Sequence, residues 1–323
     1  MSYPRTLPDF QRLFPDEGAC QAYLFGLRWP KGFLCPICSG RTVYPIDSRR
    51  AFTCTTCGRQ TYLTAGTMMH RTKLPLQTWF YGVFLITTLT PGISAVQFQQ
   101  QLGIRSYETA FQMLHKLRSA MWDPERERLV GEVEVDETYV GGVEHGKKRG
   151  RSLEGKALVV GAVEVRLTRD ERRYAGRLRL RTVASASKSD LETFVQEDVE
   201  PGTAILTDGW IGYEDLWESG YDHLVQTKSE SQEAGTKYLP LIHREFSNLK
   251  TWLQGTHHGR VEGQHLQAYL NEFVFRHNRR FWKFSAFETL LRLGLGRGPQ
   301  SYDRLYSARG TGHNVHQLGG PET

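Results

Sequence analysis

Apolar residues in the first third of the chain recur at helical spacing. Between residues 17 and 27, Ala19, Tyr23 and Leu27 fall on one face of a helix. Residues 74–121 continue the helical pattern, with a break at a Pro-Gly pair, because proline lacks an amide donor and glycine tolerates a turn. These spacings predict a helical lead-in near the N-terminus and a longer helical region after it.

The last two helices of this region form a candidate helix-turn-helix. They are expected at Ser94–Leu102 and Ser106–Met121, with a glycine in the short turn between them. In a DNA-binding pair the second helix enters the major groove, and polar residues such as His115 would point outward. Residues 67–128 are therefore predicted to be a helical DNA-binding segment, although helix pairs of this shape also serve as plain packing elements.

After residue 129 the pattern changes to strands alternating with helices. The expected elements are strands at Val130–Val140, Ala157–Val165 and Gly176–Val183, a helix at Lys188–Val199, a strand at Thr203–Leu206, a short helix at Tyr213–Ser219, a strand at His223–Thr227, and helices at Leu239–Leu253 and Gly263–Phe275. This order predicts an α/β domain with a mixed sheet. Residues 291–323 are rich in Gly, Ser, Arg and Pro, so they are predicted to be a disordered tail.

Four of the five cysteines form two closely spaced pairs, Cys35 with Cys38 and Cys54 with Cys57. Each C-x2-C pair can bring two thiolates to one tetrahedral ion, and the 15 residues between the pairs allow a hairpin to join them. The spacing predicts a structural zinc site and, with the helical lead-in, a zinc-ribbon domain over residues 1–66. Cys20 lies outside the pattern and is expected in a helix core.

The net charge of +6 is concentrated near the N-terminus. Residues 1–75 hold 10 Lys and Arg against 4 Asp and Glu, which leaves 31 of each sign in the rest of the chain. Such an excess is expected of a segment that binds a polyanion such as DNA, and a solvated basic face without a ligand is the alternative. No apolar run is long enough for a membrane span and no secretory signal is visible, so a cytoplasmic, nucleoid-associated protein is expected.

Two aspartates each follow a short β-branched and apolar stretch, at the point where a strand would meet a loop. They are Asp136, in Val133–Tyr139, and Asp208, in Ala204–Gly209. Carboxylates at neighbouring strand ends can hold Mg2+ or Mn2+, and two such ions about 3.5–4 Å apart stabilise the oxygens of a phosphoryl displacement. A catalytic metal site is one interpretation. The others are that the second aspartate belongs to an ordinary Asp-Gly turn, or that Glu137 is the useful acid.

Four longer motifs, in order along the chain, resemble those of bacterial insertion-sequence transposases of the family numbered fifteen ninety-five. They are Val135–Gly142, Thr207–Tyr213, Ser247–His257 and His265–Arg280. That family joins a zinc ribbon to a DDE-type catalytic domain, and the resemblance covers roughly residues 10–290. It implies a multi-domain protein with a ribonuclease-H-like domain over residues 129–290, in which the first acid lies on the first strand, the second after the fourth strand and the third on a later helix.

The resemblance also implies a reaction, in which water cleaves DNA at transposon ends and the freed 3′-hydroxyl attacks target DNA. Asp136 and Asp208 would hold the catalytic Mg2+ or Mn2+, and Lys250 would contact DNA near the scissile phosphate. The implied partner is double-stranded DNA, and joining two ends implies a homo-oligomer in the working complex. Two alternatives stay open, a catalytically decayed DNA-binding protein and a related metal-dependent nuclease.

The third catalytic position, which is Glu or Asn in the family, has several candidates in this chain. A helix here carries His243 and Lys250 on one flank of its apolar stripe. The other flank carries Glu245 and Asn248. Since Lys250 is expected at the DNA, His243 is its natural companion, positioning water or phosphate because imidazole is softer than Mg2+ prefers. Asn248 remains the alternative, Glu272 on the next helix is a further one, and His243 could instead be a half-buried structural histidine.

Two basic clusters complete the predicted DNA contacts. They are Lys147, Lys148 and Arg149 in a glycine-rich loop, and Arg276, Arg279 and Arg280 around the end of the last predicted helix. The loop could clamp DNA beside the first aspartate or simply be solvated. The aromatic residues interspersed with the second cluster are expected to be core.

Overall fold

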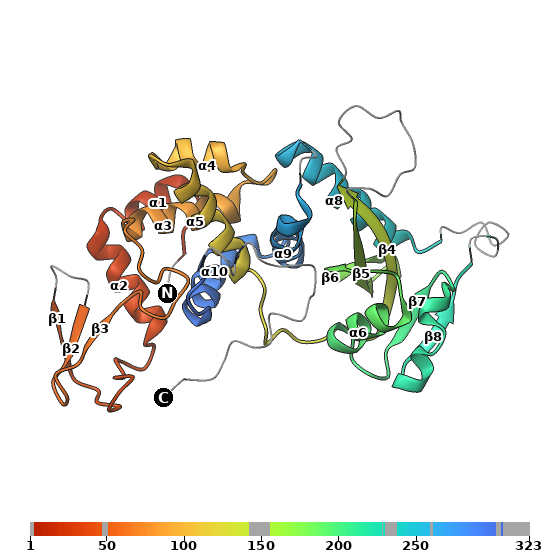
Figure 1. Cartoon of the computed structure of the whole chain (residues 1–323), viewed down its shortest axis with the longest axis horizontal. Coiled ribbons are helices and arrows are strands. Elements are labelled where there is room, and N and C mark those ends of the chain that lie inside the picture. The colour runs from red at the N-terminus through yellow and green to blue at the C-terminus, as the bar shows by residue number, and fades with distance from the viewer. Residues whose placement is uncertain are drawn as a thin grey trace. The chain divides into compact units, whose positions relative to one another are not determined.

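The chain divides into two compact units in the computed structural model. The structure describes residues 3–46, 51–141, 156–227, 229, 238–258, 261–301 and 305. Unit 1 contains Met1–Asp123 together with Phe281–Leu305, and unit 2 contains Pro124–Arg280 (Figure 1). Among the helices of these described residues, none combines the length and the apolar character that crossing a membrane requires.

Unit 1 is built from helices around a cluster of aromatic rings. Its helices are α1 (Leu7–Leu13), α2 (Glu17–Arg28), α3 (Leu76–Thr88), α4 (Ala95–Leu102), α5 (Tyr107–Ala120) and α10 (Ala286–Gly296), with the short 3-10 helix η4 (Lys283–Ser285) before the last. The rings of Phe14 after α1, Phe80 of α3 and Phe287 of α10 have centroids 4.9–6.0 Å apart, a range in which aromatic pairs attract. Helices from opposite ends of the chain therefore share one core.

The cysteine region of unit 1 forms a small antiparallel sheet. Its strands are β1 (Val43–Ile46), β2 (Ala51–Cys54) and β3 (Gln60–Tyr62), in the order β1-β2-β3. A small apolar cluster of Phe33, Cys35 and Cys54 is buried in this region. Cys20 is fully buried in α2, as its place outside the cysteine pattern predicted.

Helices α4 and α5 confirm the predicted helix pair. Ser94 and Ser106 begin them by accepting a backbone amide hydrogen bond each, and Gly103 ends α4 with a φ of 62°, which a residue with a side chain rarely adopts. The expectation that His115 points outward is wrong, because its side chain is 1% exposed. α5 packs against both α4 and α10, so more of its circumference is buried than in an isolated pair.

The prediction of a disordered tail from residue 291 is wrong for the residues that the structure describes there. Helix α10 runs to Gly296, and Leu290, Leu291 and Gly294 are buried in it. The amide of Met68 donates a hydrogen bond to the carbonyl of Gly294. The apolar spacing of α10 was obscured by its glycines. Residues 281–305 therefore belong to unit 1, whereas the catalytic domain was expected to continue to residue 290.

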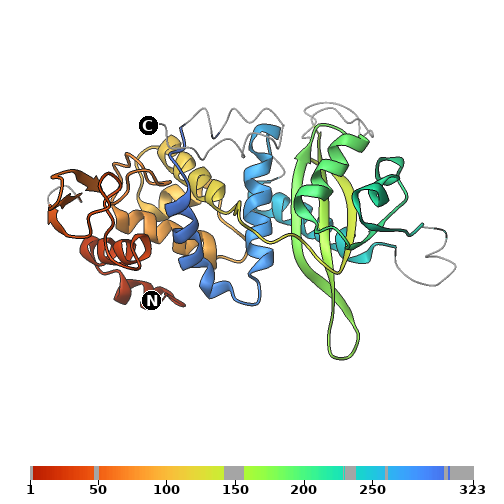
Figure 2. The ribbon, with the colours of Figure 1, turned by 90° about the horizontal axis from the view of Figure 1, so that it is seen from below.

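Unit 2 is an α/β layer structure around a five-stranded mixed sheet. Its strands are β4 (Glu132–Gly141), β5 (Lys156–Leu167), β6 (Arg173–Val183), β7 (Ala204–Thr207) and β8 (Asp222–Val225), in the order β6-β5-β4-β7-β8. The pairs β6-β5 and β5-β4 are antiparallel, and the pairs β4-β7 and β7-β8 are parallel. The β5-β6 hairpin extends beyond the other strands (Figure 2). The predicted mixed sheet is confirmed.

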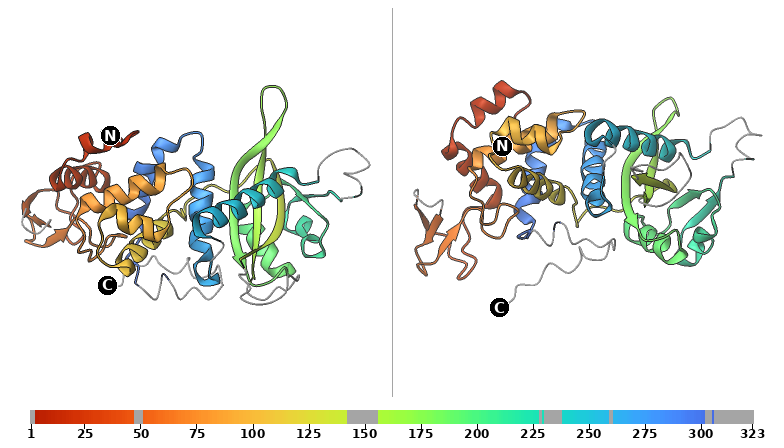
Figure 3. Two further views of the ribbon diagram at one scale, coloured as in Figure 1. Left: turned by 90° about the horizontal axis from the view of Figure 1, so that it is seen from above. Right: turned by 45° about the horizontal axis from the view of Figure 1, so that its top comes forward.

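Helices cover both faces of this sheet. They are α6 (Lys188–Asp198), α8 (Pro240–His257) and α9 (Gly263–Asn278), with the 3-10 turns η2 (Ile211–Tyr213) and η3 (Leu216–Ser219) between β7 and β8. Apolar residues of β4, β5 and β7 form one core with α6, η2 and η3. On the opposite face α8 lies along the sheet, and α8 and α9 share a second core with it (Figure 3). The apolar stripe of α8 thus points at the sheet and leaves its two flanks for polar contacts.

Glu164 of β5 is expected to make unit 2 sensitive to acid. Its buried carboxylate accepts hydrogen bonds from the amides of Val130 and Arg177 and from the guanidinium groups of Arg166 and Arg177. Burial alone would raise the pKa of Glu164, but these hydrogen bonds prevail and hold the pKa at about 2, below the ordinary 4.5. A depressed pKa means that this stabilisation is present above pH 4.5 and is lost as the pH falls toward 2.

Glu164→Gln is therefore expected to lower the free energy of unfolding at neutral pH by about 1–3 kcal/mol, because an amide accepts weaker hydrogen bonds from arginine than a carboxylate does. Urea unfolding at a series of pH values measures this, with Glu171→Gln, at an exposed position of the β5-β6 turn, as the control. The difference between wild type and Glu164→Gln should shrink as the pH is lowered below 4.5. A difference independent of pH would contradict the titration of Glu164.

Candidate active site

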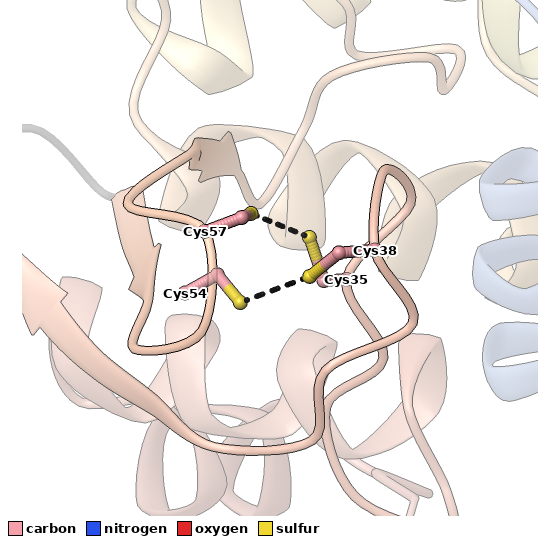
Figure 4. A group of neighbouring side chains, drawn as sticks. All are labelled: Cys35, Cys38, Cys54 and Cys57. Atoms are coloured by element: carbon pink, nitrogen blue, oxygen red, sulfur yellow. Dashed lines mark hydrogen bonds between the residues drawn. The ribbon is translucent and has the colours of Figure 1, made fainter.

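The four paired cysteines meet at one point of unit 1 (Figure 4). The Sγ atoms of Cys35 and Cys57 are 3.7 Å apart, and those of Cys38 and Cys54 are 3.6 Å apart. A tetrahedral zinc ion with Zn–S bonds of about 2.3 Å holds its sulfurs about 3.8 Å apart, so the cluster fits zinc. Among the described residues, only these cysteines form a group of three or more metal-ligating side chains with all ligand atoms within 4.8 Å of one another.

Backbone amides prepare two of the four sulfurs, those of Cys35 and Cys54, to act as thiolates. The amides of Cys57 and Thr56 donate hydrogen bonds to the sulfur of Cys54 and hold the pKa of its thiol at about 6, although burial acts against them. The corresponding amides in the first pair lower the pKa of the Cys35 thiol. Because zinc binds thiolates and not thiols, the local backbone favours the state that binds the metal.

Asp136 lies on β4, and Asp208 directly follows β7, the parallel neighbour of β4 in unit 2. The register of β4 with β7 pairs Glu134 with Leu206, and two residues further along each chain segment lead to the two aspartates. The sequence predicted that Asp136 ends a strand, but it lies within β4. The strand continues past Asp136 because β5 pairs with β4 along the whole length of β4. The shorter strand β7 ends at Thr207. Its end forms the edge of the sheet at which the two carboxylates lie.

The segment that opens α8 contacts both aspartates. His243 Nε2 lies 2.9 Å from Asp136 Oδ2. Tyr238 donates a hydrogen bond to Asp208, and its ring centroid is 4.9 Å from that of His243. A stretch of six residues therefore connects the two strands at the candidate site.

The two flanks of α8 face different surroundings, as the helical periodicity predicted. On one flank, in addition to His243, Lys250 Nζ donates a hydrogen bond of 2.7 Å to Thr138 Oγ1 of β4. On the other, a buried Glu245 carboxylate lies 3.1 Å from the Nδ1 atom of a histidine of α9 and accepts a hydrogen bond from Asn248. Asn248 is thus tied to the buried Glu245 and not to an aspartate of the candidate site.

Glu137, the alternative acid beside Asp136, is held by a tyrosine. Its Oε2 atom accepts a hydrogen bond of 2.9 Å from the hydroxyl of Tyr213 in η2. Burial, together with the charges of Asp136 and Asp208, raises the pKa of Glu137 to about 7, although the Tyr213 hydrogen bond opposes this. The contact ties the segment that follows Asp208 to β4.

The candidate site contains two tyrosines that sequence reasoning missed. Tyr213 belongs to the motif Thr207–Tyr213, so the motif could have indicated that this tyrosine lies at the site. Tyr238 falls in none of them, and its contact with Asp208 depends on how α8 docks on the sheet.

Negative charge accumulates at this edge of the sheet. The hydrogen bond to Asp136 raises the pKa of His243, with burial opposing it and the charges of Asp136, Glu134 and Asp208 adding to it. Two carboxylates on adjacent strands supply the hard oxygen ligands that Mg2+ and Mn2+ prefer, so the donors fit such a cation. Within the described part of the chain, they do not form a group of three ligand atoms as close as the cysteines do.

The arginines predicted to bind DNA at the end of α9 make contacts within unit 2. Arg276 lies 3.4 Å from Glu272, and the guanidinium of Arg279 lies 3.9 Å from the ring centroid of Phe275. Arg280 donates hydrogen bonds to carbonyl oxygens of β6. Arg280 thus joins the end of α9 to the sheet, whereas these partners of Arg276 and Arg279 belong to α9 itself. Glu272 is fully buried on α9, which removes it as an alternative third acid.

Two other expectations about basic and aromatic residues have different outcomes. Lys147, Lys148 and Arg149 lie outside the described residues. Phe281 and Trp282, expected to be core, are exposed, because they follow the end of α9 and precede η4.

Comparisons with known proteins agree with both units. Residues 128–278 match the family model described as the ISXO2-like transposase domain, and residues 15–60 match the model described as the transposase zinc-ribbon domain. The chain is also similar to a protein of Halobacterium salinarum described as an uncharacterized protein in transposable element ISH50. The two are 25% identical over 279 residues, which is 82% of this chain and 92% of that protein.

Proposed function

Because the chain belongs to the insertion-sequence transposases of the family numbered fifteen ninety-five, we propose that it cuts DNA at the ends of an insertion sequence and joins them to target DNA. One observation carries this proposal: Asp136 and Asp208 meet at one edge of the sheet, and α8 turns the flank with His243 toward them. Such an arrangement suits metal-dependent phosphoryl transfer.

The order of elements in unit 2 supports a ribonuclease-H-like catalytic domain. Asp136 lies on its first strand, Asp208 directly follows its fourth strand, and the candidate third position lies on the later helix α8. This is the arrangement that the family resemblance implied. The strand order β6-β5-β4-β7-β8, with two antiparallel and two parallel pairings, supports the same fold.

The two aspartates would form the catalytic centre. Mg2+ or Mn2+, when bound by Asp136 and Asp208, supplies positive charge to the attacking and leaving oxygens of the phosphate. Hydrogen bonds of 2.8 Å from the amides of Glu137 and Trp210 orient one oxygen of each carboxylate. The carboxylates are thus fixed before DNA binds, which lowers the entropic cost of assembling the site.

His243 and Lys250 would contact the DNA phosphates beside this centre. The hydrogen bond to Asp136 raises the pKa of His243, and the protonated ring can donate from its other nitrogen to a phosphate oxygen. Lys250 supplies a compact positive charge two residues beyond Asp136 along β4, at Thr138. Both side chains are exposed enough to reach a ligand.

Unit 1 would recognise the transposon ends. Its zinc ribbon lies in the segment that holds the excess of positive charge, and the α4-α5 pair follows that segment. Such charge supplies affinity for the phosphates of double-stranded DNA. A complete reaction joins two ends, so we propose that at least two copies of the chain act together.

A strand-transfer assay tests the proposal. The full chain is incubated with Mg2+ or Mn2+, DNA that carries the sequences flanking its gene, and a supercoiled target plasmid, and the joined products are sequenced. Joining of the flanking ends to the plasmid is the expected result. Cleavage without joining would instead identify a metal-dependent nuclease, and binding without cleavage would identify a decayed, DNA-binding transposase.

His243→Ala is expected to lower the joining rate far more than Asn248→Ala. Loss of a donor that faces a reacting phosphate costs on the order of 100- to 1,000-fold, whereas Asn248 donates a hydrogen bond to the buried Glu245 on the other flank. Single-turnover rates at saturating Mn2+ measure both variants, and each serves as the matched control for the other on the same helix. The reverse ranking would place the third catalytic position on the Asn248 flank.

A further inference from the structure

Alternate residues of β4 contact α8 at three successive points. Glu134 accepts hydrogen bonds from amides in the first turn of α8. Asp136 contacts His243 in that same turn, and Thr138 accepts a hydrogen bond from Lys250, two helical turns after His243. Side chains two apart on a strand point to the same face, so the three form one row. The central contact belongs to the candidate site, and the outer two flank it.

Helix α8 begins without a cap of its own. The residue before it, Leu239, has a φ of 35° and offers no side-chain oxygen to the free amides of the first turn. Glu134 provides that oxygen from the sheet, because its Oε2 atom accepts hydrogen bonds of 2.8 Å from the amide of Leu241 and 2.9 Å from that of Ile242. The helix N-terminus also carries partial positive charge, which favours a carboxylate there.

The glutamate is fully buried and has few other partners. Its second oxygen, Oε1, lies 3.9 Å from Arg173 Nη2, beyond hydrogen-bond distance. Removing a buried acceptor of this kind leaves two helix amides without a partner, a cost that the rest of the first turn cannot recover. The N-terminus of α8 therefore depends on Glu134 for its position on the sheet.

Packing against β5 fixes how closely α8 approaches the sheet. Gly161 of β5 is the register partner of Asp136, and a Cβ atom at this position would come within 2.7 Å of Phe246 and 2.9 Å of Ile242. The absence of a side chain lets the apolar stripe of α8 approach the sheet beside the aspartate. This contact sets the height of the helix above the sheet, and the hydrogen bonds of Glu134 set its position along the strand.

We propose that Glu134 is a positioning residue of the active site: it anchors the N-terminus of α8 to β4 and thereby holds His243 against Asp136. The importance of that pairing rests on the proposed function, but the anchoring itself does not. His243 follows Ile242 directly, so any slip of the first turn moves its ring away from the carboxylate. Leu239 offers no side-chain cap to this turn, and Gln226 Oε1 accepts a hydrogen bond of 3.4 Å from the amide of Leu239, which precedes the helix.

The test compares Glu134→Ala and Glu134→Gln with wild type in the full, zinc-loaded chain. Amide hydrogen exchange measured by NMR reports the anchoring, as the ratio of protection at Leu241 and Ile242 to protection at Leu249 in the same helix. The imidazole signals of His243 report its contact with Asp136, with Asp136→Asn as the reference for a broken contact. Neither readout requires catalytic activity, so an inactive wild type would overturn the proposed function and leave this test intact.

Glu134→Ala is expected to lower the protection ratio about 10- to 100-fold and to move the His243 signals toward those of Asp136→Asn. Glu134→Gln, which keeps an acceptor oxygen of the same reach, should restore most of both. Val195→Ala, in the core on the opposite face of the sheet, controls for general destabilisation and should change neither. An unchanged protection ratio in Glu134→Ala, or His243 signals that stay at their wild-type positions, would overturn the proposal.

Discussion

Replacing Asp136 or Asp208 by asparagine is expected to lower the rate of strand joining by roughly 1,000-fold, which corresponds to about 4 kcal/mol of activation free energy. The amide has nearly the size of the carboxylate, so the fold should survive. It lacks the negative charge that holds a divalent cation, and it offers only one oxygen as a ligand. The loss should be similar at both positions, since each strand supplies one of the two carboxylates.

Single-turnover joining rates with Mg2+ and with Mn2+ measure this effect, and calorimetry of Mn2+ binding measures its cause. Asp170→Asn is the matched control, because Asp170 is an exposed aspartate at the β5-β6 turn, where it pairs with Arg172 at the surface. It should join DNA at the wild-type rate and bind Mn2+ equally well. Wild-type rates in both Asp136→Asn and Asp208→Asn would rule out these residues as the catalytic centre.

Removal of zinc is expected to unfold the ribbon of unit 1. Binding of a structural zinc ion contributes about 10–16 kcal/mol to the folding of small zinc domains, far more than the ribbon's own core can supply. That core is small: its apolar cluster contains the buried Phe33, Cys35 and Cys54, with a few half-buried neighbours. A strong chelator, or Cys54→Ser, should therefore release the metal and expose the segment to trypsin after Arg41 and Arg59.

Zinc content by atomic absorption and peptide mapping by mass spectrometry measure the two parts of this expectation. Cys20→Ala is the control, since Cys20 is a buried cysteine of α2 outside the metal cluster and its loss should leave the zinc content unchanged. Unit 2 has its own core and should remain folded when the ribbon unfolds. A ribbon that resists trypsin after the metal has been removed would contradict a structural role for zinc.

The local pattern of residues was sufficient to predict the zinc site. Thiolates at C-x2-C spacing bind one ion wherever the intervening hairpin runs, so the four cysteines could be chosen without knowledge of the fold. The strands and helices of unit 2 were predicted to within a few residues for the same reason, since apolar periodicity depends on neighbours along the chain. Helix α10 was missed because its two glycines and its arginine resemble those of a tail, and the residues it packs against lie in helices far away in sequence.

Helical periodicity also separated the two flanks of α8 correctly. It grouped His243 with Lys250 and Glu245 with Asn248, and the contacts of α8 follow that division. Periodicity could not say which flank faces the aspartates. That choice depends on the docking of the helix, and the residues that control it lie on other elements.

The sequence by itself determined the chemistry that this protein can offer: four thiolates for zinc, two aspartates after apolar stretches, and a helix with two polar flanks. Only the tertiary structure decided which of these groups meet. The parallel pairing of β4 with β7 brings together two aspartates that are far apart in sequence, and Glu134 and Gly161 set α8 beside them. The physical reason is that periodicity and ligand spacing are properties of neighbouring residues, whereas strand register and helix docking arise from contacts between distant ones.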